Sequence, residues 1–165
     1  MTMTRSVLLG VVAGVVVATS ATTVVRAQDA EAESARIRRD LQEKAEYFLD
    51  DVANDEIQAA YETLLKDGPL EDFINESALA TKTGKLKTKY GDARDFQLVQ
   101  SKSVGKNLVV MKYLQEFREF PVVWYFTFYR RGDDLQSRND KEWVVVTVRF
   151  DTNLEGLLTA AAPGK

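Results

Sequence analysis

The chain has 165 residues, of which 22 are basic and 25 acidic, and it contains no Cys and no His. The absence of both residue types excludes disulfide bonds, a cysteine nucleophile, a Ser–His triad and zinc sites with nitrogen and sulfur ligands. A formal net charge of −3 argues against general nucleic-acid binding, which needs a basic surface to neutralise phosphates. The sequence has no acidic loop of EF-hand spacing, so we predict no metal site and no cofactor.

The first 27 residues have the order of a secretory signal peptide. Arg5 is followed by the apolar run Val7–Ala18, and Val25–Ala27 offers small residues for cleavage before Gln28. We therefore expect export to the periplasm or to the extracellular space. An alternative stays open, because Ser6–Val25 carries no charge and is long enough to cross a bilayer. If this segment is retained, the protein is a membrane-tethered accessory domain.

A flexible leader is predicted at residues 28–33, which are acidic and rich in Ala. A first helix is predicted from about Ser34 to Val52, where apolar residues recur at three- and four-residue steps and form one stripe. Ser34 is a suitable N-cap for this helix, because its hydroxyl can accept a hydrogen bond from an amide of the first turn.

The segment Ile57–Leu65 carries the strongest helical pattern of the chain, with its apolar residues on one face. Asn54 and Asp55 precede it and are expected to cap it, and Gly68 is suited to the left-handed conformation that follows a helix. A third, weaker helix is expected within Leu70–Tyr90, where several Thr residues and one Gly lower the helical propensity.

From Arg94 onward the pattern changes to four β-rich runs separated by turns, which predicts an antiparallel meander. Gly105–Asn107 has the composition of a tight turn, and Pro121 marks a strand start because it lacks an amide hydrogen. The predicted strands are residues 96–103, 108–117, 122–129 and 143–150. Helices followed by such a sheet indicate one α+β domain over residues 34–158, with a flexible tail at residues 159–165.

Alternation along the last three strands separates a core face from an outer face. The core face is expected to pack against the helices. Its residues are Val109, Met111, Tyr113, Phe117, Val122, Trp124, Phe126, Phe128, Val144, Val146, Val148 and Phe150.

The outer face of the predicted sheet is half apolar, whereas an open antiparallel sheet normally presents one polar face to water. A large apolar patch of this kind indicates contact with a partner. We therefore expect a homodimer through this face, with these interface candidates: Val123, Tyr125, Tyr129, Trp143 and Val145.

Several short sequence segments resemble those of a known family. Asp55–Tyr61 lies in the second helix, Trp124–Tyr129 is followed by a polar loop and Glu142–Val145, and Phe150–Asp151 ends the last strand. This layout resembles the nuclear transport factor 2-like superfamily, which includes ketosteroid isomerase-like domains, over residues 34–158. The resemblance implies a curved sheet wrapped on helices, which makes a cone with an apolar pocket.

Members of that superfamily are isomerases, dehydratases, polyketide cyclases, transport factors and non-catalytic binding modules. The isomerases use a Tyr and two acids inside the cone, a trio that we cannot place in this sequence. The lack of His excludes the His-dependent dehydratases of the group. Fold resemblance therefore does not select a function.

Two groups of residues are candidates for a binding site. Tyr61, Tyr113, Trp124 and Phe126 could line the apolar pocket, with hydroxyl and indole groups orienting a ligand. The alternative is that they are core aromatics whose polar tips are satisfied within the protein, which is common for such residues.

The second group is a basic run that could meet an anionic ligand or a membrane surface. It has almost no interleaved aromatics, which argues against a platform for nucleic acid. The alternative is a solvated helix face. Its residues are Lys82, Lys85, Lys87, Lys89 and Arg94.

From these observations we expect an exported, non-catalytic binding or interaction module that forms a homodimer and binds a small hydrophobic ligand. One alternative is a small-molecule enzyme of isomerase or cyclase type, with a Tyr and a carboxylate in an apolar cone. The other is the membrane-tethered domain described above, which requires a retained N-terminal segment.

Overall fold

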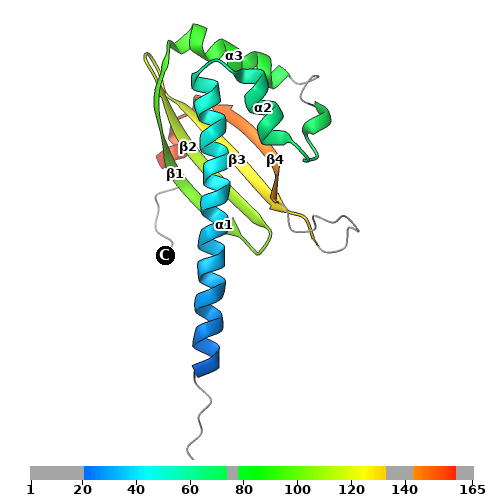
Figure 1. The fold of residues 1–165 in the computed structure, drawn as a ribbon. Coiled ribbons are helices and arrows are strands. Elements are labelled where there is room, and N and C mark those ends of the chain that lie inside the picture. The colour runs from blue at the N-terminus through cyan, green and yellow to red at the C-terminus, as the bar shows by residue number, and fades with distance from the viewer. Residues whose placement is uncertain (1–20, 74–77, 133–142, 159–165) are drawn as a thin grey trace, which may run out of the picture. The chain divides into compact units, whose positions relative to one another are not determined.

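The computed structural model describes residues 21–73, 78–132 and 143–158 (Figure 1). Three helices and a short 3₁₀ turn precede a curved, unclosed, four-stranded antiparallel sheet, which confirms the predicted α+β class. Residues from Ala35 onward form one compact unit, and the chain up to Ser34 forms a separate one. Residues 1–20 of the predicted signal peptide and the predicted tail at residues 159–165 lie outside the described residues, whereas the predicted cleavage residues Val25–Ala27 are helical.

Helix α1 spans Ala21–Ala53 and is longer than predicted. Ser34 lies inside this helix and is not its N-cap, and residues 28–33, predicted as a flexible leader, are helical. The reason is composition. Between Arg26 and Glu33 every residue except Asp29 is Ala, Glu, Arg or Gln, which are strong helix formers, and neither Gly nor Pro interrupts the stretch.

Helix α2 spans Ile57–Leu65, the segment that carries the predicted helical pattern, but its capping differs from the prediction. Glu56 holds the N-cap position and makes no side-chain hydrogen bond there, so the expected capping by Asn54 and Asp55 is wrong. Asp55 instead takes a left-handed conformation, with φ of 69°, and turns the chain between α1 and α2. A short polar side chain tolerates this region better than most.

Gly68 follows α2 as expected, but it does not take the predicted left-handed conformation. The left-handed residue after the helix is Asp67, with φ of 58°. A Cβ atom at Gly68 would lie 3.0 Å from the carbonyl oxygen of Leu65 and 3.5 Å from that of Val145. The tight contact is therefore with the end of α2, and a side chain at position 68 would require the Leu65 carbonyl group to shift.

The weaker third helix is present as α3, Ala78–Tyr90, after the 3₁₀ turn η1, Glu71–Phe73. Its buried residues, Thr83 and Leu86, face the core, and its lysines lie elsewhere on the helix. A short helix, α4, spans Glu155–Leu158 after the last strand.

The sheet is the predicted meander, with neighbouring strands paired in chain order. Gly105, with φ of 65°, begins the three-residue turn between the first two strands, as expected from its freedom to adopt positive φ. The strands are β1 (Ala93–Val104), β2 (Leu108–Phe117), β3 (Val122–Arg130) and β4 (Trp143–Asp151).

A β-bulge in β4 changes which residues face the core. Thr127 pairs with Thr147, whereas Phe128 pairs with Val145, so Val146 is an extra residue without a cross-strand partner. Before the bulge, the inward face therefore belongs to odd-numbered residues. The predicted core role of Val146 is wrong, and Val145 belongs to the core cluster instead.

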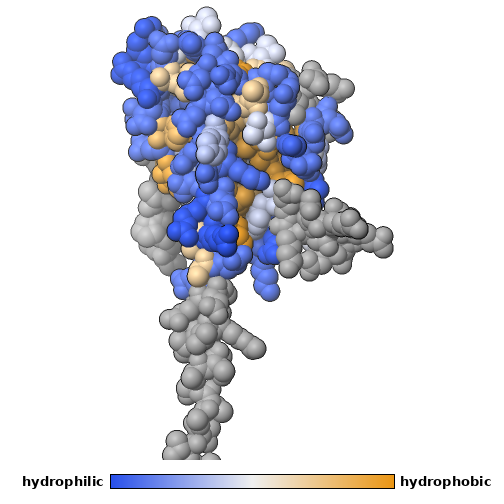
Figure 2. Space-filling view, in the orientation of Figure 1, coloured by the Kyte–Doolittle hydropathy of each residue, from blue (hydrophilic) through white to orange (hydrophobic). Residues whose placement is uncertain are grey.

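The core lies between the sheet and the helices. Its β2 and β3 members are those predicted from alternation, and α1 contributes Leu41, Ala45, Phe48 and Leu49. In the view of Figure 2, α1 and α3 present mostly hydrophilic residues to solvent, and hydrophobic residues gather beside α1. This is the pattern of an amphipathic helix packed on one face of a sheet.

Candidate binding groove

The four pocket candidates lie in the hydrophobic core, where none is more than 1% exposed. Phe48 of α1 contacts three of them edge-on, with its ring centroid 5.0 Å from that of Tyr61, 5.3 Å from Trp124 and 5.6 Å from Phe126. The fourth, Tyr113, lies edge-on to Phe126 at 5.9 Å. The structure thus brings the four candidates together as packed aromatic side chains.

The polar groups of two of these aromatic side chains have hydrogen-bond partners inside the protein. The Tyr61 hydroxyl is 2.9 Å from the Thr83 hydroxyl, and burial raises the pKa of Tyr61 to about 12. The Trp124 indole donates to Gln115 Oε1 at 2.9 Å, and Gln115 Nε2 donates to the Leu49 carbonyl oxygen at 3.3 Å. Buried polar groups are thereby paired, as a stable core requires.

Tyr113 lies beside a carboxylate, which is the pair that an isomerase-type site would need. Its hydroxyl donates to Glu46 Oε1 at 3.4 Å and to the Gln42 carbonyl oxygen at 3.4 Å. Burial, together with the negative charge of Glu46, raises the pKa of Tyr113 well above its usual value. The phenol therefore stays protonated over the physiological pH range and acts as a hydrogen-bond donor.

The five interface candidates divide between the two faces of the sheet. Val145 belongs to the core cluster and Trp143 packs against it, so their assignment to the outer face is wrong, because of the bulge. Val123 is fully buried. Tyr125 and Tyr129 lie on strand β3 outside the core cluster, and Tyr129 is 41% exposed.

The Tyr125 ring is flanked by two cations. The Arg149 guanidinium carbon is 4.2 Å from the ring centroid, and Lys112 Nζ is 5.4 Å from it. These residues are the cross-strand neighbours of Tyr125 on β4 and β2. Cation–π contacts therefore cover part of the apolar surface that the sequence predicted to be available for a partner.

A groove of about 310 Å³ lies between α3 and the end of β4. It combines lysines, apolar side chains and one carboxylate, and none of the four pocket candidates lines it. Its lining residues are Lys82, Lys85, Leu86, Lys89, Tyr90, Phe150, Asp151 and Thr152.

Three members of the predicted basic run meet in this groove, namely Lys82, Lys85 and Lys89. Their spacing of three and four residues places them along one side of α3. The Lys89 ammonium also lies 4.9 Å from the centroid of the Tyr90 ring. The structure therefore divides the basic run, because Arg94 is on β1 and does not line the groove.

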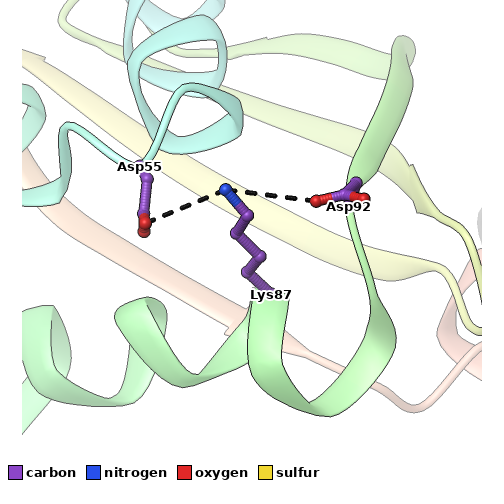
Figure 3. Close-up of polar contacts among 3 residues, drawn as sticks. All are labelled: Asp55, Lys87 and Asp92. Atoms are coloured by element: carbon purple, nitrogen blue, oxygen red, sulfur yellow. Dashed lines mark ion pairs between the residues drawn. The ribbon is translucent and has the colours of Figure 1, made fainter.

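Lys87 does not line the groove and is paired with acids (Figure 3). Its Nζ lies 3.9 Å from Asp55 and 4.0 Å from Asp92, which flank α3 from the α1–α2 turn and from the start of β1. All three side chains are exposed, so these ion pairs contribute little to stability. They do neutralise Lys87, which distinguishes it from the groove lysines.

The apolar part of the groove is held by the core. Leu86 is buried and belongs to the core cluster, and Phe150 packs on Trp124 with ring centroids 5.1 Å apart. Tyr90 is packed beside Phe117 and Phe120, at 6.5 Å and 5.6 Å. These side chains are fixed by packing, so the groove has a preformed apolar floor.

The sequence did not identify Phe150, Asp151 and Thr152 as site residues. They end β4 about 60 residues after the α3 lysines, and no local pattern links the two segments. The helical spacing of the lysines was a signal for one wall of the groove. The opposite wall depends on how the last strand is placed beside α3, which is a tertiary property.

Comparisons of the chain with protein-family models, with curated proteins and with solved structures find no match. In the described parts of the chain, no three acidic side chains come together in a group that could hold a metal ion. No helix among the described residues is both long and apolar enough to cross a membrane.

Proposed function

We propose that this chain is an exported, non-catalytic binding module and that the groove between α3 and β4 is its binding site. The observation that carries the proposal is the preformed groove of about 310 Å³, which has a fixed apolar floor and charged groups at its rim. This volume lies at the small end of the range for ligand sites, so the ligand is small.

The resemblance to the nuclear transport factor 2-like superfamily is part of this proposal. Helices followed by a curved antiparallel meander are compatible with it. That superfamily includes non-catalytic binding modules. The proposed site differs from a pocket inside the cone, because the interior positions of this chain are filled by packed aromatic side chains.

The enzymatic alternative has one supporting observation, the contact between Tyr113 and Glu46. A Tyr and a carboxylate could transfer protons if a substrate reached them. Neither residue lines the groove, and Tyr113 is fully buried against Phe96 and Phe126. We therefore favour binding over catalysis.

A homodimer remains part of the proposal, through a smaller patch than the sequence suggested. Val104, Leu108 and Tyr129 form a row across β1, β2 and β3, and Val104 and Tyr129 are 48% and 41% exposed. Light scattering tests this point. We expect a dimer for the unmodified protein and a monomer for Tyr129→Glu, and a monomer in both cases would refute it.

Titration with anilinonaphthalene sulfonate, an aromatic dye, tests the groove itself. We expect saturable binding that shifts the backbone NMR signals of Leu86, Tyr90 and Thr152. The control signals are those of Ser101 and Ser103, which lie on β1 and do not line the groove. Non-saturable binding, or shifts centred away from the groove, would contradict the proposal.

A further inference from the structure

We infer that the groove between α3 and β4 binds a small amphiphile with one anionic head group, of the alkyl carboxylate class. This inference rests on the proposed binding function and adds the chemistry of the ligand. It follows from three properties of the lining: its charge, the position of its apolar residues and its size.

The charge of the groove favours an anion. Lys82, Lys85 and Lys89 contribute three positive charges, and Asp151 is the one acidic residue among the described residues of the lining. One oxygen of Asp151, Oδ1, already accepts the backbone N–H of Asn153 at 2.8 Å. A neutral or cationic ligand would leave the lysines without a counter-charge, whereas an anion adds charge-assisted hydrogen bonds.

The lysines are spread along the groove rather than gathered at one point. Residues 82 and 89 are seven positions apart, which corresponds to about 10 Å along a helix. A single head group can therefore contact one or two ammonium groups at a time. A compact multivalent anion would need several donors converging on it, whereas the described lining adds to the spaced lysines only the hydroxyls of Tyr90 and Thr152.

The apolar residues favour a ligand with a hydrocarbon body. Leu86, Tyr90 and Phe150 form the floor, and all three are anchored by core contacts. Burying apolar ligand surface there contributes roughly 25 cal/mol per Å². An inorganic anion would leave this floor exposed to water. The ligand therefore needs an anionic head group for the lysines and a hydrocarbon body for the floor.

The test compares octanoate with two other compounds. Octanol lacks the anionic head group, and acetate lacks the hydrocarbon body. We expect octanoate to shift the NMR signals of Leu86, Tyr90 and Thr152 in a saturable way. Its affinity should exceed that of octanol by about tenfold, since two exposed charge contacts contribute about twofold to fivefold each. Its affinity should also exceed that of acetate, which lacks the hydrocarbon body that the floor would bury. Equal affinities for octanoate and octanol would overturn the inference.

Variants on one helix provide matched controls. Lys85→Gln and Lys89→Gln should each weaken octanoate binding by about twofold to fivefold. Lys87→Gln makes the same change in charge on the same helix, but Lys87 is paired with Asp55 and Asp92, so binding should not change. Equal effects of all three substitutions would overturn the inference, because the lysines would then act only through net charge.

Two further outcomes separate this inference from the proposed function. Dye binding in the groove without octanoate binding refutes the ligand class and leaves the binding module intact. Failure of both compounds refutes the ligand class and the proposed function together. Binding to vesicles that contain anionic lipid, without binding of octanoate, would overturn the inference and assign the lysines to a membrane surface.

Discussion

At the scale of single residues, the core depends on a few buried polar groups that must stay paired. Gln115 is the central one, since it accepts from the Trp124 indole and donates to the Leu49 carbonyl oxygen. It links strand β2 to β3 and to α1 at once. The core face predicted from the sequence did not include Gln115, so the polar bridge was not foreseen.

Replacing Gln115 with Met should destabilise the protein by about 1–3 kcal/mol, because the buried Trp124 N–H loses its acceptor. Urea unfolding measures this free energy. Gln97→Met is the matched control, since Gln97 is exposed on β1 and its substitution should change stability by less than about 0.5 kcal/mol. A similar small effect at both positions would show that the bridge is not important.

Tyr61 predicts a loss of stability at alkaline pH. Burial raises its pKa from 10.0 to about 12, so the folded state holds the phenolic proton more tightly than the unfolded chain does. The corresponding stabilisation is complete below pH 10 and is lost as the pH rises through 12. Compared with Tyr61→Phe, the unmodified protein should lose about 2–3 kcal/mol more over this range. Urea unfolding at several pH values measures this free energy. The same pH dependence of the free energy of unfolding in both proteins would contradict the assignment.

At the scale of elements, the bulge in β4 decides which side chains reach the core. It places Val145 inward beside Phe128 and leaves Val146 unpaired. It also explains why the predicted outer face lost two of its five residues, Trp143 and Val145. A single extra residue reverses the face of every side chain before it, as the two-residue period of a strand requires.

Substitutions on β4 test this register. Val145→Ala should cost about 1–3 kcal/mol, because it leaves a cavity in the core, whereas Val146→Ala should cost less than about 1 kcal/mol. The reverse order of the two effects would mean that simple alternation is correct and that the bulge is misplaced. Thermal or urea unfolding of the two variants distinguishes these results.

The success of sequence-based prediction differed between elements for physical reasons. The bounds of β2 and α2 were predictable because strong periodic patterns and turn residues define them. The start of α1 was missed because the chain before Ser34 lacks an apolar stripe yet has a high helical propensity. The bulge at Val146 leaves no mark in a run of consecutive Val residues.

Only the wall of the groove that α3 forms could be predicted from the sequence. The spacing of Lys82, Lys85 and Lys89 indicated a basic helix face, but no pattern showed that Lys87 pairs with acids. The residues of the opposite wall lie about 60 positions later in the chain. Aromatic residues offered as pocket candidates were instead packed in the core, which follows from their large apolar surface.

At the scale of the whole molecule, stability and binding depend on different residues. The core between the helices and the sheet holds the fold, whereas the groove lysines are exposed and contribute little to it. Lys85→Gln combined with Lys89→Gln should therefore leave the unfolding midpoint nearly unchanged while octanoate binding weakens by about fourfold to 25-fold. A large fall in stability of this double variant would show that the lysines are structural.

The most direct test of the binding module is native mass spectrometry of the protein purified from a host that exports it. We predict a dimer of chains that begin at Gln28, with a small additional mass. The Lys85→Gln, Lys89→Gln double variant should lack this additional mass. A bare chain in both proteins, or the same additional mass in both, would contradict the assignment of the groove as the binding site.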